Sequence, residues 1–111
     1  MLPEDFTLVD QVKAALRDLP VRRVVLFGSR ARGDGDAESD VDLAVVLERE
    51  EPFASFSEYS AALILLRRAL APLAARHGID LLVFTGSEWK EFQAKESAFS
   101  REVANDGVVV R

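Results

Sequence analysis

The feature that most constrains this chain is a polar, glycine-rich stretch between two apolar runs, FGSRARGDGDAESDVDLAVV at residues 27–46. Gly28 and Ser29 end the first run. After ten intervening residues, Asp40 and Asp42 open the second. A turn needs glycine and polar residues, but it does not need two carboxylates two positions apart. Because side chains alternate across a strand, these two aspartates should share one face, about 7 Å apart, while the residues beside them enter the core.

Two like carboxylates held this close repel each other, and a bound divalent cation removes that cost. A hard ion such as Mg²⁺ or Mn²⁺ suits them, because it takes carboxylates together with phosphate oxygens and water. Asp80 is a third candidate, since it lies near the start of another apolar run, IDLLVF at residues 79–84. If the two runs are neighbouring strands, the three carboxylates meet at one edge of the sheet. Such a set suits a two-metal site.

Gly28 and Ser29 suggest a phosphate site, because a glycine at a strand end lets the backbone approach a phosphate closely. The Ser29 hydroxyl and nearby N–H groups can donate hydrogen bonds to phosphate oxygens. Arg30 and Arg32 are near enough in sequence to add positive charge. We interpret Arg30 as a solvated loop residue. Arg32 could be either a solvated loop residue or a phosphate contact, and both interpretations stay open. The loop is not a P-loop, because the Gly-Lys-Ser/Thr of that motif is absent.

The remaining pattern predicts an α/β fold in which helices pack on a small mixed sheet. Strands are predicted at residues 22–27, 41–47 and 79–84, with a short edge strand at 107–111. Helices are predicted at residues 6–19 and 57–76 and from residue 85, with one helical turn at SRAR inside the loop 28–39.

Local signals refine the helices. Ser55 and Glu58 are spaced as a capping box for the helix at 57–76, as are Thr85 and Glu88 for the next one. Pro72 predicts a kink or break near residue 70. His77 is interpreted as a residue at the helix end rather than a ligand, and the aromatic residues Trp89, Phe92 and Phe99 are expected in the core.

Composition excludes several classes of function. The 111 residues predict one domain, residues 1–111, and no apolar run reaches the ~18 residues of a membrane span. Acidic residues near the N-terminus, where a signal peptide would be basic, predict a cytoplasmic protein. The absence of cysteine excludes a thiol nucleophile and thiolate zinc ligands, and one histidine leaves little for a Ser-His-Asp triad. The net charge of −5 argues against a general nucleic-acid binder and suits a basic protein partner.

The spacing G-S-x10-D-x-D resembles the pattern of the DNA polymerase beta-like nucleotidyltransferase superfamily, and FGSRARGDGDAESDVDLAVV resembles its minimal nucleotidyltransferase (MNT) branch. This resemblance implies that Asp40 and Asp42 hold Mg²⁺ and that Gly28 and Ser29 hold the triphosphate of ATP. It further implies that Asp80 completes the metal site and helps to deprotonate the acceptor hydroxyl. Beyond residue 85 the likeness is general and assigns no catalytic residue.

The expected reaction is transfer of AMP from ATP to a hydroxyl. Free-standing minimal nucleotidyltransferases resemble the antitoxin half of toxin–antitoxin pairs, so the expected acceptor is a HEPN-domain toxin that adenylylation of a tyrosine silences. Two alternatives stay open. The chain could neutralise a partner by contact alone, or it could modify a small molecule such as an aminoglycoside, with a homodimer building the missing pocket.

Overall fold

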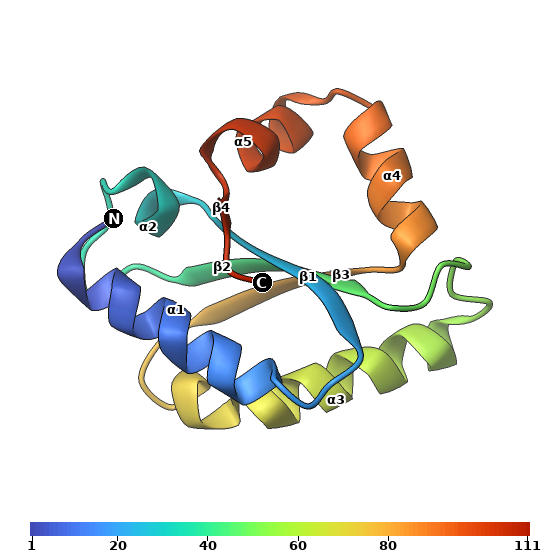
Figure 1. The fold of residues 1–111 in the computed structure, drawn as a ribbon, viewed down its shortest axis with the longest axis horizontal. Coiled ribbons are helices and arrows are strands. Elements are labelled where there is room, and N and C mark those ends of the chain that lie inside the picture. Colours follow the sequence, from blue (N-terminus) through green and yellow to red (C-terminus); the bar gives the residue numbers. More distant parts are fainter.

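Apolar runs rich in valine and leucine form the strands of a four-stranded sheet in the computed structural model, which describes residues 1–111 (Figure 1). The strands are β1 (Val21–Phe27), β2 (Val41–Leu47), β3 (Ile79–Phe84) and β4 (Val108–Val109). Their order is β3-β2-β1-β4; β1 pairs antiparallel with β2 and β4, and β2 pairs parallel with β3. The sheet is therefore mixed, as predicted, and the helix between β2 and β3 is the crossover that a parallel pair requires.

Five helices surround the sheet: α1 (Pro3–Leu16), α2 (Ser29–Arg32), α3 (Phe56–Ala74), α4 (Gly86–Ala94) and α5 (Ala98–Asp106). The first starts earlier than predicted, because Pro3 occupies the first turn and Asp5 accepts a hydrogen bond from the Leu2 N–H at 2.9 Å. The predicted turn at SRAR is α2. The Thr85–Glu88 capping box is confirmed at α4, where each residue's side chain accepts the other's backbone N–H.

The long helix α3 differs from its prediction in two details. Ser55 accepts from the Glu58 N–H, but the Glu58 carboxylate accepts from Ala54 rather than from Ser55, so the capping box is only half formed. Pro72 lies inside the helix and does not break it. Its missing N–H frees the carbonyl of Arg68 near the exposed C-terminal end, where water can bond that oxygen.

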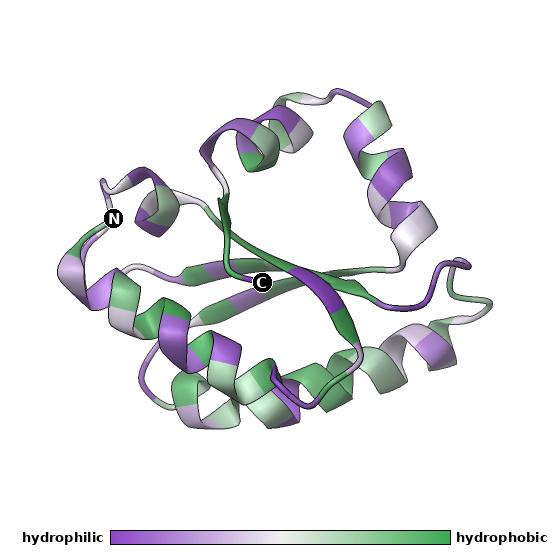
Figure 2. Cartoon of the chain, in the orientation of Figure 1, coloured by the Kyte–Doolittle hydropathy of each residue, from purple (hydrophilic) through white to green (hydrophobic).

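The helices cover the two faces of the sheet in pairs, with α1 and α3 on one side and α4 and α5 on the other (Figure 1). On the first side, leucines of α1 and α3 pack on β-strand residues; this main core includes Leu8, Leu16, Leu66, Leu70, Val24, Leu26, Val41, Leu43 and Val45. Figure 2 shows the strands mostly in hydrophobic colours between helices with mixed faces. No helix combines the length and apolarity that crossing a bilayer demands.

A smaller core fills the second side of the sheet, where Val25, Phe27 and Ala44 pack against Val103 of α5. The predicted core aromatics contribute unequally. Trp89 and Phe92 are half-buried and pack on this cluster, whereas Phe99 is 42% exposed. The Phe99 ring contacts Phe27 and Phe92 only along one side, with centroid distances of 5.6 and 5.7 Å.

Candidate active site

Strand pairing brings Asp42 and Asp80 together at one end of the sheet. The parallel register of β2 and β3 sets them directly opposite each other, and the antiparallel register of β1 sets Phe27 opposite Asp42. Asp42 is half-buried, while Asp80 is exposed on the outermost strand. Two aspartates far apart in the sequence thus become neighbours through the α3 crossover, on the sheet face that α4 and α5 cover.

The crowding of carboxylates changes the pKa of Asp42. Burial raises the pKa of Asp42 to about 6, together with the hydrogen bond and charge of Asp80 and the charges of Asp40 and Glu102. A carboxyl group with this pKa competes with its neighbours for a proton. The arrangement is costly for bare carboxylates, and a divalent cation between them would remove the cost.

Asp40 occupies a different position from its two partners. It lies just before β2, exposed, and its Oδ1 rests against Gly78, where a Cβ would overlap it. No group of three or more acidic or histidine side chains in residues 1–111 is arranged to hold one metal ion. The predicted meeting of three carboxylates is therefore formed only by Asp42 and Asp80, with Asp40 near enough to act through its charge. The donor set, carboxylate oxygens alone, fits a hard divalent cation.

Gly28 is needed at its position for two reasons. Its φ of 78° and ψ of −159° lie in a region that residues with a Cβ rarely adopt. A Cβ there would also overlap Oδ2 of Asp42. The glycine therefore lets the backbone between β1 and α2 lie directly against the carboxylate. A phosphate bound to this backbone would be close to Asp42.

Ser29 follows Gly28, and its backbone carbonyl group stabilises the turn of the loop. Its carbonyl oxygen accepts hydrogen bonds from the N–H groups of Gly33, Asp34 and Gly35 at 3.0 to 3.2 Å. Position 35 must stay small, because a Cβ there would approach the Ser29 Oγ at 2.9 Å. The serine hydroxyl therefore lies inside the loop that joins β1 to β2, beside Gly28.

Arg30 corrects the sequence-based interpretation, because it is buried rather than solvated. Its side chain is 2% exposed and forms an ion pair with Asp5 of α1, itself 1% exposed, at 2.8 Å. Arg30 also donates to the carbonyl oxygens of Ala37 at 3.1 Å and Ser39 at 3.0 Å. Ala37 and Ser39 lie three and one residues before Asp40, so the guanidinium holds the backbone that leads into it.

His77 lies in the turn that follows α3, three residues after its last residue Ala74, and its Nδ1 is 3.5 Å from Arg30 Nη2. The buried arginine therefore links α1, the loop after α2 and the segment before β3.

Arg32 and α5 form the outer side of the site. Arg32 is paired with Asp34 at 3.2 Å and with Glu102 of α5 at 2.6 Å. Hydrogen bonding to Asp34, together with Glu102, raises the pKa of Arg32. Its charge is thus already balanced by carboxylates, and its contact with a phosphate stays a prediction.

Two residues of this neighbourhood, Glu102 and Asp5, were not identified from the sequence. Asp5 did carry a signal, because it falls on the buried stripe of α1 with Leu8, Val12 and Leu16. An aspartate on an apolar stripe requires a buried partner. Glu102 carried none, since it is one acidic residue on a surface helix.

Comparisons with known proteins concern the family and the fold of the chain. A family profile described as a nucleotidyltransferase domain matches residues 9–109. A Methanocaldococcus jannaschii protein whose name proposes that it is a protein adenylyltransferase is 41% identical over 59 residues, which is 52% of this chain and 58% of that protein. The chain thus matches little more than half the length of this curated relative.

Solved structures share the fold at low sequence identity. A toxin–antitoxin crystal structure with AMP-PNP matches 93% of this chain and 72% of its own, with 19% identity and a TM-score of 0.60. A mutant of the toxin–antitoxin MntA-HpeT matches the same shares, with 17% identity and a TM-score of 0.58. A proposed nucleotidyltransferase from Sulfolobus solfataricus matches 92% of this chain and 74% of its own, with 21% identity and a TM-score of 0.54.

Proposed function

Because the chain belongs to the nucleotidyltransferase domain family, we propose that it transfers AMP from ATP to a hydroxyl group of a partner protein. The observation that carries this proposal is the pairing of Asp42 with Asp80 beside the backbone at Gly28. Paired carboxylates for a divalent cation, next to loop backbone that could bind phosphate, are the parts that nucleotidyl transfer needs. The name of the adenylyltransferase relative favours a protein as the acceptor.

Asp42 and Asp80 would hold Mg²⁺, or Mn²⁺ in its place, and Asp40 would join them once its carboxylate turned from Gly78 toward the cation. When bound, the cation would offset the repulsion of the carboxylates and neutralise charge on the phosphates. Gly28 and Ser29 would bind the triphosphate through backbone N–H groups and the serine hydroxyl.

The chain's own groups would then act on the acceptor. Asp80 is exposed beside Asp42 and would accept the proton of the acceptor hydroxyl. The acceptor oxygen forms a bond to the α-phosphorus in line, and the bond from that phosphorus to the β-phosphate oxygen breaks, releasing pyrophosphate. Arg32 would stabilise the charge on the departing phosphates if a carboxylate partner releases it.

We further propose that the acceptor is a toxin of the HEPN class and that the chain is its antitoxin. The toxin–antitoxin origin of two structural neighbours supports this pairing. The net charge of −5 suits a basic partner. When bound, that partner would position its own hydroxyl group as the acceptor.

The test is to incubate the chain with ATP, Mg²⁺ and the purified protein encoded beside it, and to measure the intact mass of that protein. We expect a mass increase of one or more AMP groups and a loss of the partner's toxicity. The control is Asp42→Ala, which should abolish the mass increase. Neutralisation by Asp42→Ala without modification would instead identify a contact-only antitoxin, and an unmodified partner in a competent assay would contradict the proposal.

A further inference from the structure

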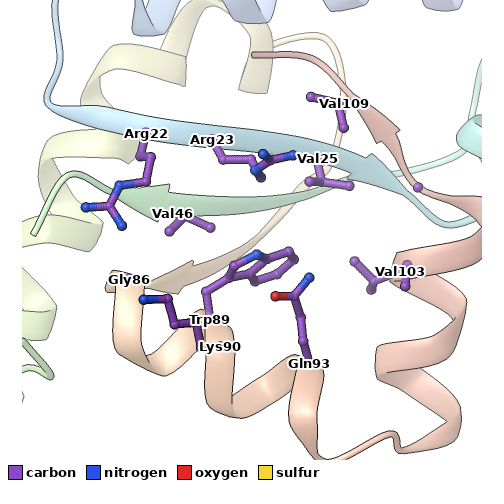
Figure 3. Close-up of a pocket in the computed structure, with 12 residues that line it drawn as sticks. Arg22, Arg23, Val25, Val46, Gly86, Trp89, Lys90, Gln93, Val103 and Val109 are labelled. Carbon is purple, nitrogen blue, oxygen red and sulfur yellow. The ribbon is translucent and has the colours of Figure 1, made fainter. Parts of the chain in front are cut away.

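A cavity of about 460 Å³ lies between the sheet and α4 and α5 (Figure 3). Strand alternation puts its lining residue Val46 on the same sheet face as Asp42, toward the other end of β2. Val46 is four residues along the strand from Asp42, a distance of about 13 Å. The cavity is therefore separate from the carboxylates.

An irregularity in β1 places Arg22 beside Arg23 at this cavity. Regular strands alternate their side chains, but the register of β1 against β2 shifts between Val21 and Arg23. Arg22 and Arg23 are consecutive, both exposed, and both line the cavity. A bulge of this kind re-aims side chains at the cost of a regular hydrogen bond.

The cavity is cationic in an acidic protein. Glu50 pairs with Arg22 and with Lys90 of α4, each at 3.0 Å, so one carboxylate serves two cations. Arg23 has no ion pair and no side-chain hydrogen bond among residues 1–111. The four groups carry a net charge of two positives, against −5 for the whole chain. Gly86 admits the Arg22–Glu50 pair, because a Cβ at position 86 would overlap both partners.

Trp89 supplies an aromatic surface in the same cavity. Figure 3 shows its ring rising from α4 toward the sheet, with Arg23 on the strand side and Gln93 one helical turn further along. The ring stacks on Phe92, with a centroid distance of 5.5 Å and an interplanar angle of 27°. Phe84 also packs edge-on against the Trp89 ring, with a centroid distance of 5.2 Å and an interplanar angle of 65°. The side chain remains half-buried, and its remaining surface lines the cavity.

We propose that this cavity is a second nucleotide site, which binds a nucleoside monophosphate with its base against Trp89 and its phosphate at Arg23 and Lys90. Stacking on an aromatic ring and charge-assisted bonds from an arginine fork are the two contacts that hold such a ligand. An acidic peptide would use the cations but leave the indole and the valines of the wall uncovered. The site does not depend on the reaction proposed above.

Tryptophan fluorescence can detect a ligand in this cavity directly, because Trp89 is the only tryptophan of the chain. The experiment titrates AMP into the Asp42→Asn variant in EDTA, so that metal-dependent binding at the carboxylates does not contribute. We expect saturable quenching of tryptophan fluorescence, confirmed by calorimetry. Arg23→Gln and Lys90→Gln should each weaken AMP binding about tenfold, as loss of a charge-assisted hydrogen bond predicts.

A matched control removes an exposed arginine elsewhere. Arg68→Gln, on the outer surface of α3, should leave AMP affinity unchanged within about twofold, and so should Asp80→Asn. The proposal is overturned if AMP causes no quenching at millimolar concentration, or if Arg68→Gln weakens binding as much as Arg23→Gln. It is also overturned if inorganic phosphate or a glutamate-rich peptide binds as tightly as AMP. None of these results bears on AMP transfer, which is measured with Mg²⁺ and the partner.

Discussion

The buried ion pair between Asp5 and Arg30 allows a prediction with a defined magnitude. Both side chains are almost wholly removed from solvent, and Arg30 Nη1 lies 2.8 Å from Asp5 Oδ1. Replacing Asp5 with alanine leaves the guanidinium buried without its anion, which costs about 3–5 kcal/mol. Asp5 also accepts the Leu2 N–H at the start of α1, and loss of that cap adds about 1 kcal/mol.

The free energy of unfolding of a typical domain is about 5–15 kcal/mol, so a loss of this size removes a large part of it. Urea unfolding followed by circular dichroism should show a much lower midpoint for Asp5→Ala. The matched control is Asp10→Ala on the same helix, since Asp10 is exposed and makes no ion pair. We expect that change to alter the free energy of unfolding by no more than about 0.5 kcal/mol.

A double variant separates stability from activity. Asp5→Leu with Arg30→Met replaces the pair by apolar groups of similar volume, a change that is often neutral or stabilising. Stability should return to within about 2 kcal/mol of the original. Nucleotidyl transfer should not return, because Arg30 no longer holds the carbonyls of Ala37 and Ser39 before Asp40. A cost below about 1 kcal/mol for Asp5→Ala would refute the energetic argument, and full activity of the double variant would refute the positioning argument.

Further predictions concern the carboxylates and the loop. In metal-free protein, carbon NMR should give Asp42 a pKa of about 6, and Asp80→Asn should lower it. Because this folded-state pKa is raised, the contribution of Asp42 to stability is present at acidic pH and is lost as the pH rises through about 6; a urea midpoint for Asp42→Asn as pH-dependent as that of the original chain would contradict this. Gly28→Ala should lower the free energy of unfolding by at least about 1–2 kcal/mol and abolish ATP binding by calorimetry, since the new methyl group would occupy the place of the Asp42 carboxylate. Glu102→Gln should tighten ATP binding by about two- to fivefold by freeing Arg32 for phosphate, and an unchanged affinity would argue that Arg32 does not contact the nucleotide.

The strands and the paired aspartates could be predicted because their signals are local. The apolar runs containing Asp42 and Asp80 identify two strands, and the position of each acid near a strand start predicts a shared edge. The register that sets the two opposite each other depends on tertiary pairing, which no local pattern specifies.

Arg30 was misread for a related reason. A charged residue in a glycine-rich loop is usually solvated, and its partner Asp5 is 25 positions away in a different element. The signal that could have identified the pair lay on α1, not in the loop. The cationic cavity was missed as well, because the register shift that exposes Arg22 and Arg23 together arises from the pairing of β1 with β2.

The parallel pairing of β2 with β3 has a consequence for the synthesis of the protein. A nascent chain that has emerged only through α3 already contains the loop 28–39, Asp40 and Asp42. Asp80 joins them only when β3 pairs with β2 at the edge of the sheet. Catalytic competence would therefore appear late during translation, after the crossover has folded. Under the proposed mechanism, a ribosome-stalled or truncated product ending before residue 79 would lack Asp80 and would not transfer AMP.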